Sequence, residues 1–86
     1  MTPKVFKILK KVDVRIRKSF KEQILLFSKN PLGQKLHNHA LKDEWEGYRS
    51  IDITADYRAI YEEVKIGKDT VAYFVDLGTH PELYDR

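Results

Sequence analysis

The fold is decided by residues 46–77, which read EGYRSIDITADYRAIYEEVKIGKDTVAYFVDL. Apolar and polar residues alternate here with a period of two, the pattern of half-buried β-strands. The stretch divides into three predicted strands, over residues 46–54, 57–65 and 70–77. Tight turns at Ala55-Asp56 and around Gly67-Lys68 join them, so neighbouring strands are expected to run antiparallel.

Two-residue turns would fix the register of these strands. Ile60 would lie opposite both Ile51 and Val75, Val64 opposite Val71 and Arg49 opposite Glu62, which makes one face aliphatic. The other face is predicted to be the functional one, and it would carry a mixed set: Tyr48, Ser50, Asp52, Ala59, Tyr61, Phe74 and Asp76. A slip of one residue exchanges the faces. In the predicted register Asp52 and Arg58 lie on opposite faces.

The preceding residues predict helices. Thr2-Pro3 is a helix start, because Thr caps free N–H groups and Pro is tolerated at the first helical position. Apolar residues then recur every three or four positions, at Val5, Leu9, Val12, Ile16, Phe20, Ile24 and Phe27. Asp13 can cap a second helix, but one bent helix fits equally, and Asn30-Pro31 ends the segment. The expected fold is α+β, with an N-terminal helical hairpin packed on one face of a three- to four-stranded antiparallel sheet.

Length and composition limit the classes of protein. The 86 residues have room for one domain (1–86) with a small core, and 42% are hydrophobic, so the chain should fold. There is no cysteine, which excludes disulfides, cysteine-ligated zinc and thiol nucleophiles and suits a reducing cytoplasm. No apolar run approaches the roughly 20 residues of a membrane span, so we expect a cytoplasmic protein with no membrane partner.

Charge is divided unevenly between the two halves. Residues 1–42 hold eleven Lys and Arg against two acids, a net +9, whereas residues 43–86 hold five against eleven, a net −6. Such a basic half is typical of proteins that bind a polyanion such as nucleic acid, or an acidic protein. A solvated lysine-rich helix face is the alternative interpretation.

Histidines and arginines supply the candidate chemistry. His80 follows Gly78 at a predicted strand end, where an imidazole can donate or accept a proton near neutral pH. His39, Asp56 and His80, with Arg49 and Arg58, are the groups needed to cleave RNA without a metal: a base for a 2′-hydroxyl, an acid for the leaving 5′-oxygen and a cation for the charge on phosphorus. Tyr57, Tyr84 and Trp45 can stack on bases, although packing is the expected role of Trp45. His37 and His39 lack convincing metal-ligand spacing, so neither a metal nor another cofactor is expected.

Four short runs carry a resemblance to a known family. They are His39-Ala40-Leu41, Trp45-Glu46-Gly47-Tyr48-Arg49, Asp56-Tyr57-Arg58-Ala59-Ile60-Tyr61 and Gly78-Thr79-His80-Pro81-Glu82-Leu83-Tyr84. In order and spacing they resemble the YafQ-like branch of the RelE/ParE toxin superfamily, over about half the chain. The resemblance implies a RelE/ParE-like fold and a toxin of a type II toxin-antitoxin system. Such a toxin binds the ribosome, cleaves mRNA during translation and is silenced by a co-expressed antitoxin.

The resemblance also implies catalytic roles. His39 and His80 match histidines implicated in catalysis, Asp56 matches an acidic site residue, and Arg58 lies where the superfamily often has a phosphate-binding arginine. His80 is the first choice for the general acid, and Asp56 or His39 for the base.

The expected substrate-binding residues are Tyr84, Tyr57, Arg49 and Asp52. Tyr84 matches a terminal aromatic, and Tyr57 stands where a tryptophan can occur. Asp52 is a departure, because the best-studied members place a histidine there. A carboxylate can act as a base, but it supplies no cationic charge and is repelled by phosphate.

A second departure is at the start of the chain, where family members usually have a strand. Either residues 4–9 form such a strand, or the sheet has one fewer strand and an exposed edge. An exposed edge would allow a homodimer or strand addition by the antitoxin. Two further functions remain open: a ParE-like toxin that inhibits DNA gyrase without nuclease activity, and a degenerate toxin that only binds antitoxin.

Overall fold

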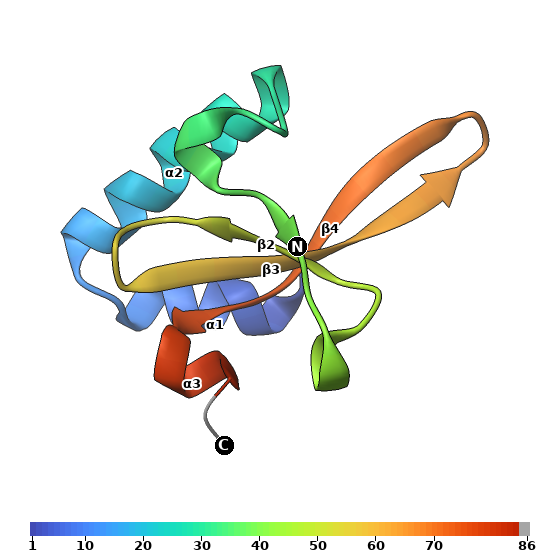
Figure 1. The fold of residues 1–86 in the computed structure, drawn as a ribbon. Coiled ribbons are helices and arrows are strands. Elements are labelled where there is room, and N and C mark those ends of the chain that lie inside the picture. The colour runs from blue at the N-terminus through green and yellow to red at the C-terminus, as the bar shows by residue number, and fades with distance from the viewer. Residues whose placement is uncertain (85–86) are drawn as a thin grey trace.

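Two helices, a four-stranded sheet and a short third helix follow one another along the chain (Figure 1). The structure, a computed structural model, describes residues 1–84. Helices α1 (Pro3–Lys11) and α2 (Val14–Lys29) come first. The sheet follows, with strands β1 (His39–Ala40), β2 (Arg49–Asp52), β3 (Tyr57–Ile66) and β4 (Asp69–Thr79), and then helix α3 (His80–Tyr84). Two short 3₁₀ helices, η1 (Gln34–Leu36) and η2 (Asp43–Trp45), lie on either side of β1. The predicted α+β fold is confirmed.

Side-chain caps divide the helical half in two. The Val5 N–H donates to Thr2 Oγ1 at 3.4 Å, and the Arg15 N–H donates to Asp13 Oδ1 at 2.7 Å. The bond from the Arg15 N–H, followed by that from its side chain, lowers the pKa of Asp13. The chain therefore forms two capped helices, and residues 4–9 are helical rather than a strand.

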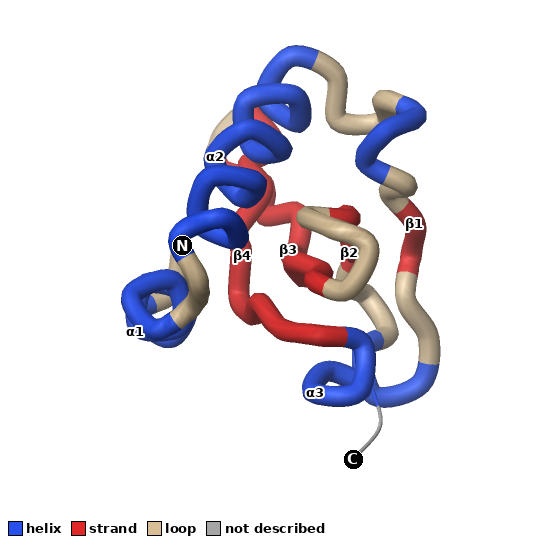
Figure 2. The backbone as a smooth tube through the Cα atoms, turned by 90° about the vertical axis from the view of Figure 1, so that its left-hand side faces the viewer, coloured by secondary structure: helices blue, strands red, loops and turns tan. Residues whose placement is uncertain are grey.

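The sheet is antiparallel in the order β1-β2-β3-β4. Figure 2 shows α2 and α3 on opposite sides of the sheet, with α1 beside β4. At that edge the Thr2 N–H donates to the Phe74 carbonyl at 3.1 Å and the Thr2 hydroxyl to the Val75 carbonyl at 3.4 Å. The residue that caps α1 thus occupies two carbonyls at the outer edge of β4, where a further strand would otherwise pair.

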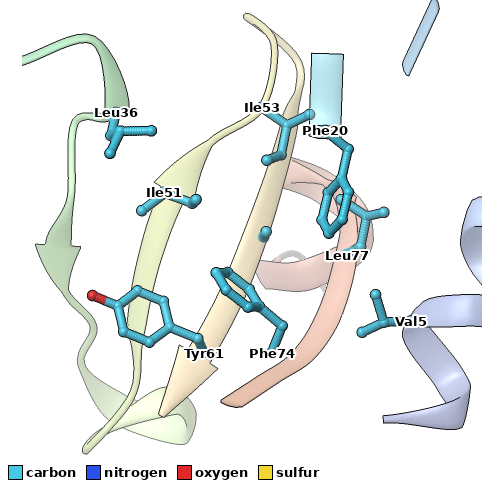
Figure 3. Packing of buried hydrophobic residues seen from close by; sticks show 9 residues of the cluster. Val5, Phe20, Leu36, Ile51, Ile53, Tyr61, Phe74 and Leu77 are labelled. Carbon is cyan, nitrogen blue, oxygen red and sulfur yellow. The ribbon is translucent and has the colours of Figure 1, made fainter. Parts of the chain in front are cut away.

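The main core lies between α2 and one face of the sheet, here called the α2 face (Figure 3). Tyr61 and Phe74 form its aromatic centre, with ring centroids 5.2 Å apart, and Phe27 of α2 packs edge-on against both. Its buried members are Val5, Phe20, Leu36, Ile51, Ile53, Ala59, Tyr61, Phe74 and Leu77. Burial of these side chains is the main force that holds the helices on the sheet.

The predicted register is wrong by one residue between β2 and β3. Residues 53–56 form a four-residue turn in place of the expected Ala55-Asp56 pair, so Ile51 lies opposite Ala59 and Arg49 opposite Tyr61, not Glu62. Ile60 lies opposite Ser50 and Asp76 in place of Ile51 and Val75. The expected pairing of Val64 with Val71 is confirmed.

A bulge in β4 completes the change of faces. Tyr61 pairs with Phe74 and Ile60 with Asp76, which leaves Val75 as an extra residue. Ala59, Tyr61 and Phe74, predicted on the polar face, therefore lie in the main core. The opposite side of the sheet, here called the second face, carries Ser50, Asp52, Arg58, Ile60 and Asp76. Asp52 and Arg58 thus share a face, contrary to the sequence-based expectation.

We predict that Ile51→Ala lowers the free energy of unfolding by about 2 to 5 kcal/mol, because it opens a cavity at a fully buried position. Ile66→Ala is the matched control, since Ile66 is 63% exposed near the tip of the β3–β4 hairpin and should change stability by about 0.5 kcal/mol or less. Urea denaturation measures both. Equal effects of the two substitutions would contradict the position of the core.

Candidate functional site

A row of three paired residues crosses the second face where β2 ends and β3 begins. Arg58 lies opposite Asp52 on one side and Gly78 on the other. Arg58 Nε is 2.9 Å from Asp52 Oδ1, and both side chains are about one-fifth exposed. Arg58 Nη1 also donates to the carbonyls of Thr54, Ala55 and Tyr57 at 3.0 to 3.3 Å. The ion pair and the turn therefore hold the guanidinium in place.

His37 contacts the other oxygen of the same carboxylate. Its Nδ1 lies 2.7 Å from Asp52 Oδ2, and its side chain is 68% exposed. The residue follows η1 with a left-handed backbone, φ 47° and ψ 45°. From the sequence, His37 is a candidate only for a metal site, because nothing in its neighbourhood points to a residue fifteen positions later. The array His37, Asp52 and Arg58 is a finding of the structure.

His39 follows on the short strand β1, opposite Ser50. Its ring is exposed, and its Nδ1 lies 2.8 Å from the His37 carbonyl oxygen. A carbonyl only accepts, so Nδ1 carries the proton and Nε2 has the lone pair when the ring is neutral. His37 and His39 are thus linked through one peptide group.

A capping box positions His80 at the start of α3. The Thr79 N–H and hydroxyl each donate to Glu82 Oε1 at 2.8 Å, and the Glu82 N–H donates to Thr79 Oγ1 at 3.4 Å. Because these two groups donate to the charged form, the pKa of Glu82 is lowered. The His80 N–H donates to the Asp56 carbonyl at 3.3 Å, which attaches the helix start to the β2–β3 turn. His80 and Asp56 are therefore neighbours through the backbone.

Two of the three candidate aromatics, Tyr84 and Trp45, are partly enclosed. Tyr84 packs against His80 with ring centroids 4.7 Å apart, and its hydroxyl is buried with no hydrogen-bond partner among residues 1–84. Trp45 donates from Nε1 to the Leu83 carbonyl at 3.1 Å and packs on Tyr48, which confirms the packing role expected for it. The Trp45 bond thus joins α3 to η2, whereas the contact between Tyr84 and His80 lies within α3.

Comparison with known proteins gives the family. The model of the family "Bacterial toxin of type II toxin-antitoxin system, YafQ" matches residues 3–85. The chain belongs to the YafQ family. A search among curated proteins found no significant match.

Solved structures agree with this assignment. The chain is similar to YafQ from Escherichia coli BL21(DE3), with 25% identity and a TM-score of 0.76 over 96% of this chain and 92% of that one. A copper-bound mutant toxin from Helicobacter pylori is 29% identical, with a TM-score of 0.64 over 96% and 93%. A YoeB/ParE toxin from Agrobacterium tumefaciens shares the fold, at 21% identity and a TM-score of 0.73 over 92% and 93%. The protein is thus a type II toxin with a RelE/ParE-like fold, and this family implies an antitoxin partner.

In this YafQ-family toxin, the side chains of two predicted site residues, Arg49 and Tyr57, lie on the other side of the sheet from that of Arg58. Arg49 and Asp52 lie on opposite faces of β2, and Arg49 is on the side of Tyr61 and the main core. Its Nε donates to Asn38 Oδ1 at 2.8 Å. Tyr57 packs against the main core and lines a cavity that α1, β4 and α3 also line. The structure therefore gathers Asp52 and Arg58 on the second face, and Asp56 and His80 at the adjoining turn.

Two further observations concern metals and membranes. Within residues 1–84, no three His, Asp or Glu side chains are grouped so that they could hold a metal ion. In the same part of the chain, no helix has the length and apolar character needed to cross a membrane.

We predict that Glu82→Gln removes a pH-dependent part of the stability. A carboxyl with a lowered folded pKa stabilises the fold above its unfolded value of 4.5, and this contribution is lost as the pH falls through the folded value. The difference in unfolding free energy between wild type and variant should therefore shrink as the pH falls below about 4.5. Urea denaturation across a pH series measures it, and a difference independent of pH would contradict the capping box.

Proposed function

We propose that this toxin is a ribosome-dependent endoribonuclease that cleaves translated mRNA by metal-independent general acid and base chemistry. The observation that carries the proposal is the arrangement at one end of the sheet. Arg58 is held on the second face by Asp52 and the turn carbonyls, and the same turn binds the backbone of His80. One turn thus bonds to both the guanidinium of Arg58 and the backbone of His80.

The residues divide the reaction between them. Arg58 stabilises the negative charge that builds on the phosphorus oxygens, because a fixed cation at low exposure acts without reorganising. His80, exposed at the start of α3, protonates the leaving 5′-oxygen. His39 and Asp56 are the sequence-based candidates for the base, and Tyr84 supports His80 by ring contact.

The helices supply the basic surface for ribosomal RNA. All the Lys and Arg residues of α1 and α2 are exposed: Lys4, Lys7, Lys10, Lys11, Arg15, Arg17, Lys18, Lys21 and Lys29. Binding through phosphate contacts should weaken steeply as salt rises, because condensed counterions are released. A ribosomal target places the active toxin in the cytoplasm, where the cognate antitoxin wraps and silences it.

Primer extension on a translated reporter mRNA tests the proposal. Brief induction of the wild-type toxin should create new 5′ ends inside the reading frame, and His80→Gln should abolish them because Gln cannot transfer the proton. Growth arrest without new ends would contradict the proposal and favour inhibition of gyrase. Unchanged growth and unchanged mRNA would favour a toxin that only binds its antitoxin.

We predict that Arg58→Ala lowers the cleavage rate by about 100-fold or more, since loss of one charge-stabilising donor typically costs this much. Lys68→Ala is the control, because Lys68 lies at the exposed tip of the β3–β4 hairpin and should leave the rate unchanged. Arg58→Lys separates charge from geometry, and we expect only partial activity because Lys lacks the planar fork that Asp52 and the turn hold. Equal rates for the Arg58→Ala and Lys68→Ala variants would remove Arg58 from the site.

A further inference from the structure

We infer that His37 is the general base of this site, an inference that rests on the proposed endoribonuclease function. Its imidazole is the exposed end of an array that continues through Asp52 to Arg58. The two oxygens of one carboxylate thus bind the group assigned to proton transfer and the group assigned to phosphate. A substrate phosphate held by Arg58 would therefore lie close to the His37 ring.

The carboxylate fixes which nitrogen of His37 is basic. An ionised carboxylate only accepts hydrogen bonds, so the proton of the neutral ring is on Nδ1, which is 2.7 Å from Asp52 Oδ2. The lone pair is then on Nε2, at the opposite side of a ring that is 68% exposed. This is the form and the orientation that a base needs.

The backbone around His37 is arranged to keep the ring there. His37 has a left-handed backbone that residues other than glycine seldom adopt, and such strain is typical of functional positions. Leu36, beside it, is anchored in the main core. Gln23 of α2 donates from Nε2 to the carbonyls of Lys35 at 3.4 Å and of Asp52 at 2.9 Å. The segment with His37 and the strand with Asp52 are thus held by the same side chain.

His37 has an advantage over the other candidate bases. The Nδ1 of His39 contacts only a peptide carbonyl, whereas the Nδ1 of His37 contacts the carboxylate of Asp52. That negative charge stabilises the His37 ring when it takes up a proton and becomes positive. Asp56 is exposed in the turn, and its backbone rather than its carboxylate contacts α3. The carboxylate that stands at position 52 therefore acts through an imidazole from the neighbouring segment.

The step balances with residues of this chain alone. His37 Nε2 takes the proton of a 2′-hydroxyl, and the 2′-oxygen forms a bond to phosphorus. The bond from phosphorus to the 5′-oxygen breaks, and protonated His80 gives its proton to that oxygen. The products are a 2′,3′-cyclic phosphate and a 5′-hydroxyl, and both rings return to their starting states by exchange with water.

Substitution and chemical rescue of His37 test the inference on the full-length toxin in a reconstituted translation reaction. His37→Gly suits the left-handed backbone and removes the ring. We expect it to lower the cleavage rate by about 100-fold or more at saturating ribosomes, with unchanged ribosome binding, and added imidazole to restore a substantial part of the rate. Imidazole restores a missing base but does not repair a purely structural defect.

Two further variants complete the design. Asp52→Asn should lower the rate without being rescued by imidazole, because His37 is still present. Asp43→Asn is the control, since Asp43 is an exposed residue that also has a positive φ, 57°, and it should cleave like wild type. His37→Asn tolerates the same backbone and keeps the test open if the glycine variant fails to fold.

The outcomes separate the two proposals. If wild type cleaves and both His37 variants cleave within about threefold of it, or if imidazole does not restore a slow His37→Gly variant, the base is another residue and the endoribonuclease function stands. If the wild type itself does not cleave, both proposals are overturned.

Discussion

The bulge at Val75 is the constraint on which the arrangement of the sheet depends. Regular alternation would place Phe74 and Leu77 on opposite faces, but the extra residue turns both into the main core. It also leaves Asp76 on the second face, opposite Ile60. The carbonyls of Phe74 and Val75 accept hydrogen bonds from Thr2 at this point, so the bulge is also where the first helix is attached. One inserted residue thus sets which residues of β4 lie in the main core and which on the second face, and it lies where α1 is attached.

Sequence patterns predict the features that depend on neighbouring residues, such as helix caps and the periods of helices and strands. The change from a helical period to an alternating one gives the order of elements, and Thr2 and Asp13 cap helices as their side chains suggest. The register could not be obtained in this way, because it depends on the number of residues in the β2–β3 turn and on the bulge, neither of which has an unambiguous sequence signal. The one-residue error in register matters most for Asp52 and Arg58. The predicted register places them on opposite faces, whereas in the structure they are directly paired.

The candidate site was predictable where it lies on one continuous stretch of chain. The run from Thr79 to Glu82 contains its own capping box, so the position of His80 follows from local bonds. The pairing of His37 with Asp52 joins a 3₁₀ segment to a strand across fifteen residues and requires a backbone conformation that histidine seldom adopts. No pattern of residue types predicts such a contact, so the sequence alone does not indicate a pairing of His37 with Asp52.

The contacts of Asp52 explain how a carboxylate can stand in a site that binds phosphate. An isolated carboxylate repels phosphate, but here a guanidinium contacts one oxygen and an imidazole the other. Both of its oxygens are therefore paired with nitrogen donors, and of the three side chains only His37 is largely exposed, at 68% against about one-fifth for Asp52 and Arg58. Because both contacts involve one partly buried side chain, movement of Asp52 would displace both groups together. The geometry of the site thus depends on Asp52, and the chemistry depends on the residues that it holds.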